Sequence, residues 1–309
     1  MKRSVFVVTL LCLLGLMGSL VAEESPRLGI NTDGWEDGVT VSQDGKTVYF
    51  IYKPYDPAFL EAGYQKKGPE RPKNHGNNFD IYRALRQADG NWGEPEAVVE
   101  LNSMKDEFSP SLTSDGKVMY LVRDVAMSQT VLFFSMLTNQ VWSAPSLLPA
   151  PYNSSFGEES PYQAYNDSAF IFASRRIRFT TPWLLWISYR DEQGILGMPE
   201  KMPVNSIYND WQATTDPSSG DLYFISDRDG DADIYVARNT GSRCWGKPEK
   251  IKKDWQADVI SSPCFDGTGK HLYFSYALAG ETGFIDIYVS TLQADNSWGK
   301  PVSIDNFKP

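Results

Sequence analysis

The sequence is poor in the side chains that build metal centres and disulfide scaffolds. Its 309 residues include three cysteines and two histidines, His75 and His271. A histidine-rich metal site cannot be built from two histidines. Acidic residues outnumber basic residues by 39 to 29, which gives a formal net charge of −10. Because a negative chain repels phosphate backbones, we expect no nucleic-acid partner.

Long apolar runs are also absent, except at the N-terminus. There a short basic start precedes the apolar run Val5–Leu16, and small residues lead to Ala22. This pattern predicts a secretory signal peptide over residues 1–22, too short to span a membrane. We therefore expect residues 23–309 to form one exported domain, periplasmic or secreted, without membrane insertion.

What the sequence does contain is a repeat of about fifty residues. Each unit has a turn flanked by apolar residues, which is the signature of a β-hairpin. The five turn segments are "VTVSQDGKTVYF", "SPSLTSDGKVMYL", "SPYQAYNDSAFIF", "ATTDPSSGDLYFI" and "SSPCFDGTGKHLYF".

A third apolar segment and a closing phrase follow each hairpin. The third segments include "DIYRAL", "DIYVAR" and "DIYVST", and the closing phrases include "WGEPEAV", "WSAPSLL" and "WGKPEKI". The closing prolines Pro95, Pro145, Pro199, Pro248 and Pro301 are 50, 54, 49 and 53 residues apart. Four short strands at a fixed period predict an all-β, five-bladed β-propeller with four antiparallel strands per blade.

These phrases resemble the TolB-like, WD-repeat-like propellers of bacterial exported proteins. The resemblance covers Trp35 to Ile304 and rests on "SPSLTSDGKVMYL", the three "DIY" segments and the tryptophan-Gly-x-Pro phrases. It implies a binding propeller, although propellers serve many functions. Outer-strand phrases occur near both ends of the chain, so either terminus could complete the last blade.

An acidic residue recurs at one position of the repeat. Counting thirteen residues back from the second-strand aromatic, or matching Phe172 to Leu121, gives Glu36, Glu107, Glu158 and Asp210, with Ile260 in the fifth unit. The first strand of a propeller blade lines the central channel, so this spacing places four carboxylates at the channel mouth.

Two interpretations of these carboxylates remain open. Arginines follow the second strands and should open on the same face, among them Arg123, Arg175, Arg176 and Arg228. The carboxylates and arginines could form structural ion pairs, or they could bind a ligand.

The first unit carries an insertion between its second and third strands, "KPYDPAFLEAGYQKKGPERPKNHGNN". It is basic and aromatic in an otherwise acidic chain, and includes Tyr55, Tyr64 and His75. Long loops on rigid scaffolds often bind ligands, so these three residues join the candidate site. A surface loop without a function is the alternative.

Two smaller features concern metals and thiols. "DRDGDADIY" places Asp229, Asp231 and Asp233 at the spacing of a calcium loop, but the distal Glu of such loops is missing. Otherwise we expect no cofactor. Cys244 and Cys264 fall at different radii of the predicted disc, which predicts two free, buried thiols.

Two functions follow from these observations. The first is an exported, non-catalytic propeller that binds a protein, a peptide or an envelope glycan at the channel-mouth face. The alternative is a glycoside hydrolase that uses Glu36, Glu107 and Glu158, since some five-bladed propellers place an acid and a base on successive blades.

Overall fold

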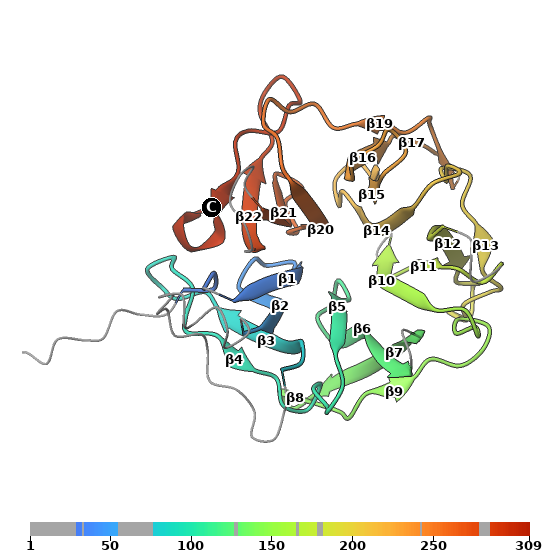
Figure 1. The fold of residues 1–309 in the computed structure, drawn as a ribbon, viewed down its shortest axis with the longest axis horizontal. Helices are drawn as coiled ribbons and strands as arrows, with labels where there is room; N and C mark the ends of the chain where they lie inside the picture. Colours follow the sequence, from blue (N-terminus) through green and yellow to red (C-terminus); the bar gives the residue numbers. More distant parts are fainter. Residues whose placement is uncertain are drawn as a thin grey trace, which may run out of the picture.

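The computed structural model describes residues 29–32, 34–54, 77–126, 129–164, 167–177, 182–241, 243–277 and 285–309. These residues form five antiparallel four-stranded sheets arranged as a ring, which confirms the predicted five-bladed propeller (Figure 1). None of the described segments is a helix long and apolar enough to cross a membrane.

Each blade is built from consecutive strands, ordered outward from the centre of the ring. The first blade consists of β1 (Trp35–Val41), β2 (Thr47–Lys53), β3 (Asp80–Leu85) and β4 (Glu96–Ala97), and the second of β5 (Glu107–Leu112), β6 (Val118–Ala126), β7 (Gln129–Thr138) and β9 (Ser146–Leu147). The third blade consists of β10 (Glu158–Ala164), β11 (Ala169–Ser174), β12 (Leu184–Tyr189) and β13 (Glu200–Lys201), and the fourth of β14 (Asp210–Thr215), β15 (Leu222–Ser226), β16 (Asp233–Ala237) and β19 (Glu249–Lys250). The fifth blade consists of β20 (Val259–Phe265), β21 (His271–Ala277), β22 (Asp286–Thr291) and β23 (Val302–Ser303).

The remaining elements extend the outer rim. Strand β8 (Val141–Trp142) pairs with the far end of β7, and β17 (Asn239–Gly241) pairs with β18 (Cys244–Trp245). A short 3-10 helix, η1 (Ile304–Asn306), follows β23.

The hydrophobic core is divided among the five junctions between blades. Each junction has its own cluster of buried apolar residues from the two facing sheets. The second strands are therefore buried on both faces, and all residues of β11 and β15 are buried. This burial explains the unbroken apolar runs in the sequence, because a sheet with one wet face would alternate.

Among the described strands, the ring closes without an exchange between the first and the last blade. The C-terminal phrase supplies β23, so the fifth blade is made of C-terminal residues alone. The N-terminal segment joins it through side chains. Asn31 hydrogen-bonds the main-chain N–H and C=O of Ile287, and Asp305 accepts the N–H groups of Ile30 and Asn31.

The cysteine prediction is half right. Neither Cys244 nor Cys264 forms a disulfide, as predicted. Cys264 lies partly buried in the channel wall, where burial raises the pKa of its thiol to about 11. Cys244 is exposed, because it sits in the β17–β18 hairpin at the rim and not in the outer strand of the fourth sheet.

Candidate functional site

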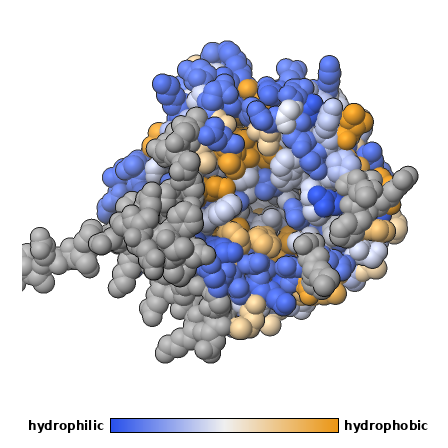
Figure 2. Space-filling view, viewed as in Figure 1, coloured by the Kyte–Doolittle hydropathy of each residue, from blue (hydrophilic) through white to orange (hydrophobic). Residues whose placement is uncertain are grey.

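The five innermost strands surround a narrow central channel. Each contributes three consecutive residues to its wall: 38–40, 109–111, 160–162, 212–214 and 262–264. The channel offers about 50 Å³ to the centres of water-sized molecules, so it is wide enough for water or an unbranched chain. Figure 2 looks down the same axis and shows a hollow at the centre of the ring, bordered by both apolar and polar side chains.

A β-bulge interrupts every inner strand at the channel. The strand register shifts between residues 37 and 40, 108 and 111, 159 and 162, 211 and 214, and 261 and 264. The first bulged residue has a left-handed backbone in all five blades, with φ between 46° and 62°; these residues are Gly38, Ser109, Ser160, Gln212 and Ser262. Bulges of this kind bend a strand and redirect its side chains.

The four predicted carboxylates occupy equivalent positions, as the spacing predicted. Glu36, Glu107, Glu158 and Asp210 each begin or nearly begin an inner strand, and Ile260 is their counterpart in the fifth blade. All four are 0 % exposed. We call them the loop carboxylates, because the crossover loop that enters each blade folds over them.

A local motif holds each loop carboxylate. The residue four positions earlier is Ser or Thr, whose hydroxyl or backbone N–H donates to the carboxylate. Ser103 Oγ lies 2.5 Å from Glu107 Oε1, and Ser206 Oγ lies 2.9 Å from Asp210 Oδ2. Thr32 binds Glu36 and Ser154 binds Glu158 in the same way.

The residue before that Ser or Thr is always asparagine. Asn102 donates to the C=O of Ile81 and accepts its N–H, which links the loop to the third strand of the preceding blade. Asn31, Asn153 and Asn205 make the same pair of bonds. The pattern Asn-Ser/Thr-x-x-x-Glu/Asp stands four times in the sequence, so the repeat itself could have revealed it.

Arginines complete three of these sites. Arg123 Nε is 2.7 Å from Glu107 Oε1, and Arg228 Nη2 is 2.5 Å from Asp210 Oδ1. In the third blade Arg176 pairs with Glu158 at 3.7 Å. Its neighbour Arg175 instead stacks over Trp183, 4.3 Å from the ring centre.

The site of Glu36 differs, because its nearest charged neighbour is acidic. Burial raises the pKa of Glu36 well above its ordinary value, and the negative charge of Asp286 raises it further, against the hydrogen bond from Thr32. At Glu107, burial also raises the pKa, while Ser103 and Arg123 oppose the shift. The site of Glu36 thus lacks the arginine that offsets burial at Glu107.

The residues that face the mouth of the channel follow the loop carboxylates by one position. They are Asp37, Phe108, Glu159, Trp211 and Ser261, which stand immediately before the five bulges and next to the residues that line the channel. The sequence analysis did not single them out. Asp37 Oδ1 accepts hydrogen bonds from Ser261 Oγ and Ser262 Oγ, each at 3.0 Å. We call Asp37 and Glu159 the mouth carboxylates.

Glu159 has a different environment from Asp37. Its carboxylate forms no hydrogen bond with any residue that the structure describes, although its main chain pairs with Ala173 on β11. Burial raises its pKa to about 7, and the positive charge of Arg175 only partly opposes that shift. Glu159 can therefore hold or release a proton near neutral pH.

Aromatic side chains lie beside the mouth. Trp35 is 39 % exposed and packs edge-on against Phe79 with ring centres 5.7 Å apart. Lys53 lies over Phe79 at 4.8 Å, and Phe79 packs against Phe108 at 5.4 Å. Half-exposed rings paired with cations provide flat apolar surfaces next to hydrogen-bond donors.

The remaining predicted residues have separate outcomes. Tyr55, Tyr64 and His75 lie outside the described residues. The three aspartates of the calcium hypothesis do not converge. Asp229 accepts the hydroxyl of Tyr235, and Asp233 pairs with Lys253 at 3.3 Å. No three His, Cys, Asp or Glu side chains gather as a metal site anywhere in the described ranges.

Comparison with known proteins identifies a fold and no family. No family model matches the sequence, and no curated protein matches it significantly. Among solved structures, an α-L-arabinofuranosidase from Lactobacillus brevis superposes with a TM-score of 0.58 and 13 % identity, covering 91 % of this chain and 98 % of that one.

Two TolB structures also superpose. A putative TolB from Agrobacterium tumefaciens gives a TM-score of 0.50 at 15 % identity, over 91 % of this chain and 81 % of the other. TolB from Acinetobacter baumannii gives 0.50 at 14 % identity, over 88 % and 71 %. At such low identity these similarities support a TolB-like propeller fold.

Proposed function

We propose that this chain is an exported, non-catalytic propeller that binds a protein, a peptide or an envelope glycan at the mouth of its channel. The observation that supports this most directly is the surface around the mouth. Trp35 is 39 % exposed beside Phe79 and Lys53, while Arg175 stacks on Trp183. Exposed rings and cations on a rigid sheet scaffold are typical of recognition surfaces.

The loop carboxylates contribute to this function indirectly. Each is 0 % exposed and is bonded to the loop that covers it. Their role in binding would be to fix the loops that surround the mouth. The arginines Arg123 and Arg228 would act in the same way, whereas Arg175 would face the ligand.

The binding function is tested by screening peptide and glycan arrays with the purified protein, then repeating each hit with Trp35→Ala. We expect the variant to lose at least tenfold in affinity, because a central aromatic contact often contributes about 2 kcal/mol or more. Leu85→Ala is the matched control. Leu85 is 48 % exposed and is the last residue of β3, at the end of that strand away from Phe79. A hit whose affinity is equal in both variants would place the binding surface elsewhere.

Glycoside hydrolysis is the second candidate. One observation favours it: the pKa of Glu159 is raised to about 7, which suits a general acid. The fold similarity to an arabinofuranosidase is compatible with it. Glu36, Glu107 and Glu158 would have to leave their loops to reach a substrate, whereas Glu159 and Asp37 would not.

An assay with aryl α-L-arabinofuranosides distinguishes the two candidates. Hydrolysis that disappears in Glu159→Gln would support the enzyme. Binding of an array hit without any hydrolysis, in wild type and variant alike, would support the non-catalytic function.

A further inference from the structure

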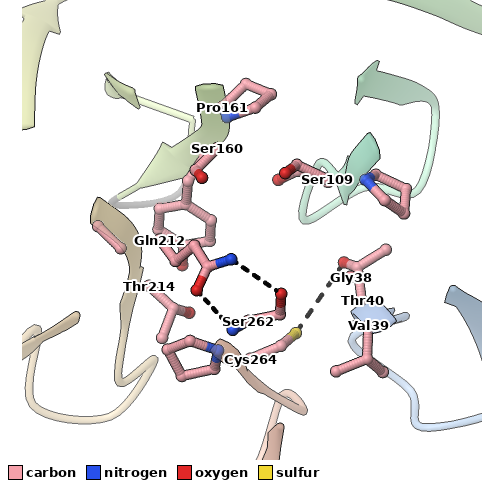
Figure 3. A pocket seen from close by; sticks show the side chains of 15 residues that line it. Gly38, Val39, Thr40, Ser109, Ser160, Pro161, Gln212, Thr214, Ser262 and Cys264 are labelled. Carbon is pink, nitrogen blue, oxygen red and sulfur yellow. Dashed lines mark hydrogen bonds between the residues drawn. The ribbon is translucent and has the colours of Figure 1, made fainter. Parts of the chain in front are cut away.

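A buried hydroxyl faces the channel without a partner. Ser160 is 6 % exposed, and its Oγ has no hydrogen-bond partner among the residues that the structure describes. Figure 3 shows this hydroxyl and that of Ser109 turned into the space between the strands. An unsatisfied buried hydroxyl is unfavourable, and one that faces a channel can be satisfied by a bound group.

The backbone at the same place is strained. Ser109 and Ser160 have φ of 46° and 52°, a region that L-residues other than Asn and Asp seldom adopt. The first blade places Gly38 at the equivalent position, which shows that glycine fits the bulge. Strained backbone of this kind collects at ligand sites.

At the equivalent position just before the bulge, successive blades alternate acids and aromatic rings. Asp37 and Glu159 come from the first and third blades, and Phe108 and Trp211 come from the second and fourth. Carboxylates attract a cation by charge, and aromatic faces attract it through their quadrupole. Arg175 is the basic residue that acts on Glu159, yet burial still raises the pKa of Glu159 to about 7. A second cation that hydrogen-bonds Glu159 would therefore stabilise its ionised form.

The small volume of the channel favours one kind of cation. A space of about 50 Å³ suits the slim methylene chain of a lysine better than the bulkier planar guanidinium of an arginine. A primary ammonium has three donors and needs three acceptors. Ser109 Oγ, Ser160 Oγ and the Glu159 carboxylate can supply them.

We propose that the channel mouth is a receptor for a primary ammonium group, carried by a lysine side chain of a protein or peptide partner. This proposal rests on the binding function above and refines it. The ammonium lies at Glu159, Ser160 and Ser109, and Phe108 and Trp211 pack against the methylene chain.

The test uses three synthetic pentapeptides, Ser-Gly-Lys-Gly-Ser, the same peptide with Nε-acetyl-lysine, and Ser-Gly-Arg-Gly-Ser. Their amino termini are acetylated, so that the side chain is the one amine. Binding to the purified protein is followed by saturation-transfer NMR titration. We expect the lysine peptide to bind at least tenfold more tightly than the acetyl-lysine peptide, because a charge-assisted hydrogen bond to Glu159 is lost.

Two variants assign the site. Glu159→Gln should weaken the lysine peptide at least tenfold, and Ser160→Gly should weaken it about threefold or more while relieving the backbone. Glu192→Gln and Ser168→Ala, on exposed residues of the same blade, should leave affinity unchanged. Melting temperatures at or above wild type would show that both site variants are folded.

Equal binding of the lysine and acetyl-lysine peptides would overturn the proposal, as would wild-type affinity in both site variants. If the lysine peptide fails while an array hit still binds through Trp35, the ammonium receptor is wrong and the binding function stands. If no array hit depends on Trp35 but the lysine peptide binds through Glu159, the ammonium receptor is supported and the proposed binding surface around Trp35 is wrong.

Discussion

Glu158 and Glu159 are neighbours on β10, yet the fold treats them in opposite ways. Glu158 points into the junction with the second blade, where Ser154 N–H, Ser174 Oγ and Arg176 surround it. Glu159 precedes the channel-lining Ser160, and its carboxylate forms no hydrogen bond with the described residues. The comparison shows that a carboxylate satisfied by its own loop stabilises the fold, whereas its unsatisfied neighbour is available to a ligand.

The largest loss of stability should come from removing a loop carboxylate that pairs with an arginine. Asp210→Ala should lower the free energy of unfolding by about 3–5 kcal/mol, since Arg228 would remain mostly buried without its anion. Chemical denaturation measures the loss, with Glu192→Ala in an exposed turn as a control for removing a charge. A loss below about 1 kcal/mol would show that the ion pair is not structural.

The asparagine that ties each loop to the preceding blade should matter nearly as much. Asn102→Ala removes a donor and an acceptor from the main chain of Ile81, so we expect a loss of about 2–3 kcal/mol. The exposed Asn77→Ala should cost less than about 0.5 kcal/mol in the same denaturation experiment. Similar values for the two variants would contradict the proposed link between blades.

Replacing Glu159 should raise stability instead of lowering it, and the size of this gain should depend on pH. Its pKa is about 7 in the folded protein against about 4.3 in an unfolded chain. The stability that the protonated form contributes is complete below the unfolded value and is lost as pH rises through 7. Glu159→Gln should therefore be more stable than wild type by about 2 kcal/mol at pH 8 and by little at pH 4.

Thermal and urea unfolding at both pH values check this prediction. Glu192→Gln, which is exposed, should show no such pH dependence. A Glu159→Gln variant that is less stable than wild type at pH 8 would mean that Glu159 has a structural partner.

The smallest effect should come from removing the hydroxyl of Ser160. Ser160→Ala should cause no loss of stability, because its Oγ has no partner in the described structure and its removal leaves no hydrogen bond broken. Ser103→Ala should cost about 1–2 kcal/mol, since its hydroxyl lies 2.5 Å from Glu107 Oε1. Thermal melts of the two variants, measured in parallel, test this difference between the two serines. An equal loss of stability in both would contradict it.

The sequence determined the architecture by itself. The turn segments, the "DIY" strands and the closing prolines recur at a fixed period, and a sheet apolar on both faces can only be buried against copies of itself. The spacing from the second-strand aromatic also located Glu36, Glu107, Glu158 and Asp210 in equivalent positions.

Only the tertiary structure decided which side chains face the channel. The bulge after each loop carboxylate sets the direction of the following residues, and a one-residue difference along a strand moves a side chain to the other face. Counting along the sequence therefore reached Glu158 and passed over Glu159. The partners are equally non-local, since whether Glu158 meets Arg175 or Arg176 depends on how the chain leaves β11. Burial and charge at a site arise from packing between blades, which no single repeat contains.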